Sequence, residues 1–90
     1  MPAARRSALF HTAFLDDLRY WIETDRALAL RVLELVEAVL KDPFQGIGRP
    51  APLRHQYAGC WSRRVSQEHR MVYRVTPSTV EFLQARYHYR

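Results

Sequence analysis

The sequence predicts a single α+β domain built from a short N-terminal strand, two helices and a C-terminal antiparallel sheet packed on the helices (β-α-α-β-β-β). Apolar residues recur at helical spacing over residues 12–41, whereas β-branched and aromatic residues alternate from residue 57 onward. Prolines and glycines gather between these halves, over residues 43–56, and predict a loop with a fixed path. Ninety residues suit one domain over residues 1–90, with residues 1–7 expected to be a flexible extension.

The N-terminal elements are expected to be a strand over Ala8–His11 and a helix that ends near Glu23. Thr12 is suited to cap this helix, because its hydroxyl can accept from the unpaired backbone N–H groups of the first turn. The buried stripe of the helix is expected to carry four residues at helical spacing: Phe14, Leu18, Trp21 and Ile22.

A second helix has the strongest periodic pattern in the chain. Thr24 and Asp25 can cap its start, Lys41 suits the negative end of the helix dipole, and Pro43 ends it. Its apolar residues repeat at i, i+4, i+7, i+8, i+11 and i+12: Leu28, Val32, Leu35, Val36, Val39 and Leu40.

Three strands are expected over residues 57–65, 69–75 and 79–87. The turns between them are short, at Gln67-Glu68 and at residues 76–78, so neighbouring strands should be antiparallel. The alternation of the middle strand separates a core face (Met71, Tyr73, Val75) from a face that carries Arg70, Val72 and Arg74. Because covering arginines is costly, this second face is expected to meet solvent or a polyanion.

Composition argues against several protein classes. No apolar run approaches the ~18 residues of a membrane helix, and the first residues lack the apolar region of a secretory signal, so a cytoplasmic protein is expected. Cys60 is the single cysteine, and we interpret it as a small half-buried residue rather than a nucleophile. No cluster of side chains has metal-ligand spacing, so neither a metal nor another cofactor is expected.

Positive charge is concentrated in the C-terminal half. Residues 1–45 hold six basic and seven acidic side chains, whereas residues 46–90 hold eight basic and two acidic ones, and the chain carries a net charge of +5. Thirteen of the fourteen cations are arginines, which match phosphate oxygens and stack on bases. This distribution favours nucleic acid as a partner about as strongly as it favours a merely solvated basic surface.

The polar residues of this half fit RNA cleavage without a metal. Such cleavage needs a base for the ribose 2′-OH, an acid for the departing 5′-oxygen and a cation for the charge on the phosphorane. For the two residues at positions 88 and 89, the residue types alone favour the alternative of an exposed strand end with polar tips. The candidates are Arg54, Arg63, Arg64, Glu68, Arg70, Arg86, His88 and Tyr89. Trp61, beside them in the sequence, fits either the core or stacking on a base.

Five segments of the chain resemble the YoeB/Txe group of toxins in the RelE superfamily. They are YWIETD (20–25), PFQGIGRPAPL (43–53), GCWSRRV (59–65), EHRMVY (68–73) and ARYHY (85–89). The resemblance extends over about residues 8–89 and implies a RelE-like fold. It also implies the toxin of a type II toxin–antitoxin system, a ribosome-dependent endoribonuclease that cuts mRNA in the A site.

The resemblance further implies partners and residue roles. A YefM-type antitoxin would wrap and block the toxin, the complex would bind operator DNA, and a homodimer is expected. Arg70 matches the arginine that stabilises the transition state, His88 the general acid and Tyr89 a substrate-positioning tyrosine, with Glu68 near the active centre. The residues expected to bind RNA or ribosomal RNA are Arg54, His55, Arg63, Arg64 and Arg86.

One position departs from the family. Where the family commonly has K-P-E-P-L, this chain has R-P-A-P-L, so Ala51 replaces the glutamate that usually serves as general base. Glu68 or His88 could act as the base, the ribosome could supply the function, or the protein could cleave slowly and act mainly by binding. We favour retained but altered cleavage.

Two other functions compete with the nuclease. A binding module would occupy the ribosome or nucleic acid and act with its antitoxin as a corepressor, and Ala51 favours this reading. A relative that targets gyrase, as ParE toxins do, is opposed by the His-Tyr ending.

Overall fold

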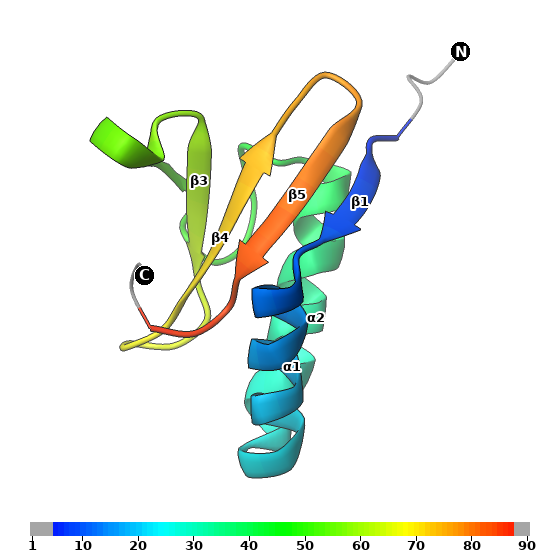
Figure 1. Ribbon diagram of the computed structural model, residues 1–90, viewed down its shortest axis with the longest axis vertical. Helices are drawn as coiled ribbons and strands as arrows, with labels where there is room; N and C mark the ends of the chain where they lie inside the picture. The colour runs from blue at the N-terminus through cyan, green and yellow to red at the C-terminus, as the bar shows by residue number, and fades with distance from the viewer. Residues whose placement is uncertain (1–4, 88–90) are drawn as a thin grey trace.

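Residues 5–87 are described by the computed structural model, and they form a five-stranded sheet with two helices on one face (Figure 1). The elements are β1 (Ser7–Phe10), α1 (Thr12–Thr24), α2 (Arg26–Lys41), β2 (Ala51–Pro52), the 3-10 turn η1 (His55–Tyr57), β3 (Cys60–Arg64), β4 (Arg70–Val75) and β5 (Thr79–Gln84). The predicted class and the order of its main elements are confirmed.

The strand order in the sheet is β1-β5-β4-β3-β2. Strands β3, β4 and β5 are antiparallel neighbours, as the short turns predict, and β2 also pairs antiparallel with β3. Strand β1 instead lies parallel to β5, with Ser7 opposite Thr79. This pairing was not part of the prediction, because a parallel contact is made through a long connection and leaves no local pattern.

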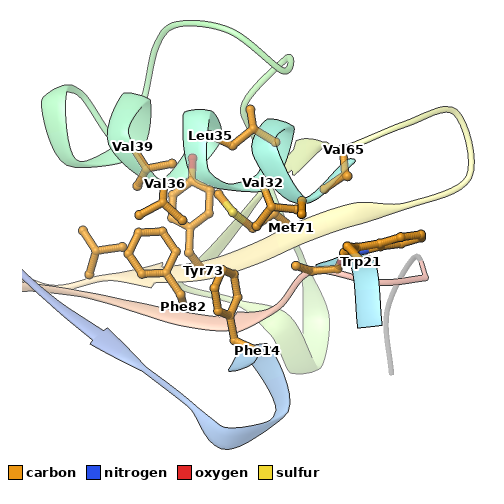
Figure 2. Close-up of a cluster of buried hydrophobic side chains, with 13 residues drawn as sticks. Phe14, Trp21, Val32, Leu35, Val36, Val39, Val65, Met71, Tyr73 and Phe82 are labelled. Atoms are coloured by element: carbon orange, nitrogen blue, oxygen red, sulfur yellow. The ribbon is translucent and has the colours of Figure 1, made fainter. Parts of the chain in front are cut away.

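The core lies between α2 and the sheet (Figure 2). Four residues of the predicted α2 stripe are buried (Val32, Leu35, Val36 and Val39), while Leu28 and Leu40 are half-buried at its ends. The sheet contributes Met71 and Tyr73, which confirms the predicted core face of β4. Asp25 caps α2 as predicted, because its side chain accepts from the backbone N–H of Leu28.

The inward face of α1 differs from the prediction. Phe14, Asp17 and Trp21 are buried, whereas Ile22 is 57% exposed. Spacings of three and four residues place the first three side chains along one line of the helix, and Ile22 is rotated about 100° from Trp21. The cap position is also wrong by one residue, since His11 rather than Thr12 precedes the first turn.

The ends of the predicted strands also need correction. Ser7 already belongs to β1, and Arg6 donates to the carbonyl of Thr76, so an extension over residues 1–7 is too long. Strand β3 begins only at Cys60, because η1 and the left-handed Gly59 precede it. Strand β5 ends at Gln84 rather than at residue 87. The segment predicted as loop contains the short strand β2.

An ion pair at the outer end of the sheet predicts a pH effect on stability. Arg74 donates to both carboxylate oxygens of Glu81 (2.9 and 3.0 Å), and His11 lies 3.2 Å away. The hydrogen bond from Arg74, followed by that from His11, lowers the pKa of Glu81 to about 2.

A carboxylate with a lowered pKa stabilises the fold above its unfolded pKa of about 4.3, and this contribution is lost as the pH falls toward 2. Glu81→Gln is therefore expected to flatten the fall in the urea midpoint between about pH 5 and pH 2. Urea unfolding at five pH values across this window checks the prediction. Parallel curves for the variant and the wild type would contradict it.

Candidate functional site

The candidate site lies on the outer face of the sheet, opposite the helices. Strand pairing lines up four residues there in one row: Ala51 beside Ser62, Ser62 beside Val72, and Val72 beside Gln84. Paired residues point to the same side of a sheet, so all four belong to this face. Ser62 and Val72 are nevertheless buried, so the centre of this face is not the open surface that the sequence predicts.

Two arginines flank this row at the end where β3 leaves the sheet and β4 enters it. Arg64 and Arg70 are directly paired, and both are half-buried. Like charges at paired positions repel one another, and an anion such as phosphate would relieve that repulsion. Arg70 also reaches toward Ser62, with 3.5 Å between Nη1 and Oγ. Within residues 5–87 neither arginine forms a salt bridge.

Ala51 lies inside this site although it is distant from Arg70 in sequence. It pairs with Ser62, whose hydroxyl is the partner of the Arg70 guanidinium. The missing glutamate of the family therefore leaves a methyl group, half-buried, at the edge of the arginine pair.

Glu68 occupies the turn between β3, which ends at Arg64, and β4, which begins at Arg70, and so lies beside the arginine pair. The hydroxyl of Ser66 accepts from the backbone N–H groups of Glu68 and His69, at 3.3 and 3.2 Å, and holds the turn. Glu68 itself is exposed at the rim, two residues before Arg70.

The C-terminal segment also reaches this end of the sheet. The backbone N–H of Arg70 donates to the carbonyl of Tyr87 at 2.8 Å. The guanidinium of Arg86 is stacked between the rings of Tyr20 (3.4 Å) and Tyr87 (4.6 Å). Stacking of this kind ties Arg86 to α1. His88 and Tyr89, the predicted acid and positioning residue, lie outside the described residues.

Arg63 does not belong to the site, and its prediction as an RNA-binding residue is wrong. Alternation in β3 turns it to the core side, where it is fully buried. Its guanidinium donates to the carbonyls of Asp42 (2.5 Å), Gln45 (2.9 Å) and Ile47 (3.0 Å), and to the hydroxyl of Tyr73 (3.1 Å). Arg63 therefore fastens the loop after α2 to the sheet.

The two neighbouring glycines of this loop have a steric role. Gly48 has φ +85°, and a Cβ there would lie 2.8 Å from Leu35 Cδ2 and 3.1 Å from the Cβ of Arg63. Gly46 likewise has φ +123°, and a Cβ there would lie 3.1 Å from Nη1 of Arg63. The loop can approach β3 this closely because neither position carries a side chain.

Arg54 and His55 lie at the opposite end of β3, where Leu53 pairs with Cys60. Both are exposed and line a surface pocket formed by residues 52–57. At about 3.3 Å per residue, β3 separates them from the arginine pair by about 13 Å. The predicted RNA-binding residues are therefore divided between the two ends of the strand.

The remaining aromatic and sulfur side chains of β3 have structural surroundings. Trp61 packs against the core and lies 5.1 Å from the ring of Phe44, centroid to centroid. Cys60 is 6% exposed, so this small apolar residue is buried rather than half-buried as the sequence predicts. Burial raises the pKa of its thiol and so favours the unreactive protonated form.

Four side chains near the site are not among the residues that the sequence predicts for it: Asp17, Trp21, Ser62 and His69. Asp17 accepts from the backbone N–H of Ala85, and Trp21 donates to the carbonyl of the same residue, both at 2.9 Å. His69 Nδ1 accepts from the backbone N–H of Tyr87 at 2.8 Å. A carboxylate three residues after Phe14 and four before Trp21, on the buried stripe, is the signal that could have identified Asp17.

No helix within residues 5–87 has the length and apolar character needed to cross a bilayer. No three His, Cys, Asp or Glu side chains in this range gather as metal ligands do.

A family model described as the YoeB-like toxin of bacterial type II toxin–antitoxin systems matches residues 10–89. The chain belongs to the YoeB family. It is therefore a toxin of a type II toxin–antitoxin system, and the predicted family is confirmed. Toxin YoeB of Mycobacterium bovis is 44% identical over 84 residues, which cover 93% of this chain and 99% of the relative. Toxin YoeB of Escherichia coli K12 is 45% identical over 74 residues, 82% and 88% of the two chains.

Solved structures of the YoeB family have the same fold. A YoeB/ParE toxin from Agrobacterium tumefaciens superimposes with a TM-score of 0.88 at 38% identity, over 92% of this chain and 99% of that one. A YoeB dimer from Staphylococcus aureus does so with a TM-score of 0.85 at 30% identity, over 96% and 100%. A YoeB–YefM complex from the same organism gives 0.82 at 29% identity, over 96% and 100%.

Proposed function

We propose that this YoeB-family toxin is a ribosome-dependent endoribonuclease that cuts mRNA in the A site by metal-free acid–base chemistry and so inhibits translation in the cytoplasm. The observation that carries the proposal is the pair Arg64 and Arg70, which has no salt bridge within residues 5–87 and adjoins both Ser62 and the segment before His88. Two adjacent guanidinium groups on a partly covered surface suit a phosphodiester on which charge develops.

The proposed roles follow the needs of the reaction. Arg70 stabilises the phosphorane, with Ser62 holding its guanidinium in place, and Arg64 binds the adjoining phosphate. Glu68 takes the proton of the 2′-OH in place of the glutamate absent at position 51, and His88 protonates the departing 5′-oxygen. Tyr89 positions the substrate.

The outer parts of the basic surface would bind RNA along the strand. Arg54 and His55 at one end of β3, and Arg86 at the other, are the residues proposed for mRNA or ribosomal RNA. Phosphate contacts of this kind give affinity without sequence preference.

The proposed protein partner is a YefM-type antitoxin, because the related toxin of S. aureus forms a YoeB–YefM complex. Charge favours an antitoxin segment that brings acidic and apolar residues to the basic face. We propose operator DNA as a ligand of that complex. We also propose a homodimer of the free toxin, in line with the YoeB dimer of S. aureus.

The test is primer extension on a defined mRNA with purified ribosomes whose P site is occupied. A new 5′ end within the A-site codon, absent when ribosomes are omitted, is the expected result. Ribosome binding without a cut at saturating toxin would contradict the nuclease. It would support the second candidate, a module that acts by occupancy and with its antitoxin as a corepressor, which Ala51 favours.

Restoring the missing carboxylate is expected to speed cleavage. Ala51 pairs with Ser62 at the edge of the arginine pair, so Ala51→Glu would add a base at the site. We expect the single-turnover rate to rise about 10-fold, less than the full ~10²–10⁴ contribution of a general base, because Glu68 already supplies one in the proposed reaction. Ala51→Gln has the same size without the charge and is the matched control. Equal rates for the two variants would show that position 51 does not supply a base.

A further inference from the structure

We propose that Asp17 and Trp21 of α1, together with His69 of the β3–β4 turn, are positioning residues for RNA cleavage. They act by holding the segment Ala85–Tyr87, which immediately precedes the proposed general acid His88 in the chain. This inference rests on the proposed nuclease function. It assigns a part in the chemistry to residues that never touch the RNA.

We call Asp17, Trp21 and His69, the three residues that hold this segment, the clamp. The first half of the clamp comes from one face of α1. Asp17 Oδ2 accepts from the N–H of Ala85, and Trp21 Nε1 donates to the C=O of Ala85, both at 2.9 Å. The two side chains are four residues apart and therefore neighbours on the helix. Both are buried, and so is Ala85. Strand β5 ends at Gln84, so the next residue, Ala85, has its backbone N–H and C=O bonded by side chains of α1 instead of by a neighbouring strand.

The second half holds Tyr87 in the same manner. His69 Nδ1 accepts its N–H and the backbone N–H of Arg70 donates to its C=O, both at 2.8 Å. The His69 ring itself stands edge-on against Trp21, with 4.7 Å between ring centroids. The two halves therefore meet at one aromatic contact, which links α1, the β3–β4 turn and the segment Ala85–Tyr87.

The backbone conformation of Tyr87 indicates that these hydrogen bonds hold the segment in a conformation it would otherwise disfavour. Its φ is +61°, the left-handed region that residues with a side chain disfavour. Such a conformation persists where the surroundings determine it, and here both backbone groups of Tyr87 are bonded. The chain consequently leaves the extended path one residue before His88, which a continued strand would not do.

A positioning role and a purely structural role for Asp17 predict different cleavage rates in the presence and absence of His88. If Asp17 acts only through the tail, its loss should slow cleavage as long as His88 is present and should have no effect once His88 is gone. A purely structural Asp17 would lower the rate in both backgrounds. Non-additivity of this kind is the signature of residues that act as one unit.

The experiment measures single-turnover cleavage of mRNA on saturating programmed ribosomes for Asp17→Ala, His88→Ala and the double variant. We expect Asp17→Ala to lower the rate about 10- to 100-fold, because small misplacement of a reacting group costs that much. The concentration for half-maximal rate should stay within about twofold, and the double variant should match His88→Ala within about twofold. Asp17→Asn keeps an acceptor oxygen and should recover most of the rate.

Matched variants keep the test decisive. Asp16→Asn changes the exposed carboxylate next along α1 and should cleave as the wild type does. If Asp17→Ala does not fold, Trp21→Phe replaces it in the same cycle, because it removes the indole N–H and keeps an aromatic ring in the core.

The outcomes that overturn the inference are distinct from failure of the nuclease. A folded Asp17→Ala that cleaves at the wild-type rate overturns it, and so does an equal loss in both backgrounds, while the nuclease stands in either case. A wild-type protein that binds ribosomes without cutting overturns the proposed function and this inference together.

Discussion

Arg70→Ala is expected to lower the single-turnover rate of A-site cleavage by at least about 100-fold while the fold remains intact. Arg70 is half-buried and reaches toward Ser62, beside Arg64. In the proposed reaction its guanidinium faces the phosphodiester on which charge develops. A cation placed in this way acts in the transition state more than in the ground state. The loss should therefore fall on the rate at saturating ribosomes.

Arg74→Ala is the matched control for this prediction. Arg74 lies on the same face of β4 but at its other end, and it is exposed and paired with Glu81. We expect its removal to leave the rate within about twofold, because Arg74 lies at the far end of β4 from the proposed site and its guanidinium is bonded to Glu81. Equal losses for the two variants would show that the whole basic surface, rather than the site at Arg70, governs the reaction.

Arg63→Met is expected to be the most destabilising single substitution that the structure identifies. Methionine fills a similar volume but leaves three loop carbonyls and the Tyr73 hydroxyl without their buried donor. Each unsatisfied buried group costs about 1–3 kcal/mol, so a loss of about 3 kcal/mol or more is expected. For a domain of this size that lowers the melting temperature by about 12 °C or more.

Urea unfolding measures this effect against Arg64→Met, its neighbour on the outer face. The Arg64 side chain is half-buried and makes none of the hydrogen bonds to the loop that the Arg63 side chain makes, while the Arg64 backbone N–H, which donates to the carbonyl of Gly48, is kept in the variant. The replacement should therefore change stability by no more than about 0.5 kcal/mol. A midpoint for Arg63→Met that matches the control would mean that the loop after α2 is held by other contacts. Tyr73 also packs against this loop, because its hydroxyl donates to the carbonyl of Pro43. Burial raises the pKa of the Tyr73 hydroxyl, and the hydrogen bond from Arg63 partly opposes that rise.

Local pattern predicted the parts of the fold that depend on neighbouring residues. The α2 stripe, the Asp25 cap and the alternation of β4 all follow from spacings of one to four residues, and the structure has each of them. The basic half of the chain likewise locates the candidate site on β3 and β4. Resemblance to the YoeB family added the roles of Arg70 and of position 51, which composition could not assign.

Residue type alone did not predict the different surroundings of Arg63 and Arg64. Residue type treats the two as equal, yet one is buried under a loop and the other borders the site, because successive residues of a strand point to opposite faces. Trp61 and Val65, two residues before and after Arg63, are apolar and pack at the core. Their spacing indicates that the Arg63 side chain points to the same side. A buried arginine is rare enough that charge outweighed this signal in the prediction.

The sequence by itself determined the class of the domain, its two helices, its antiparallel strands, its basic half and its family. Only the tertiary structure decided that β1 joins β5 in parallel, that Ala51 lies beside Ser62, and that Asp17 is turned inward to hold Ala85. The physical reason is separation along the chain. Residues 17 and 85 meet because two elements close on one core, and no periodicity within either element records the partner that the other will supply.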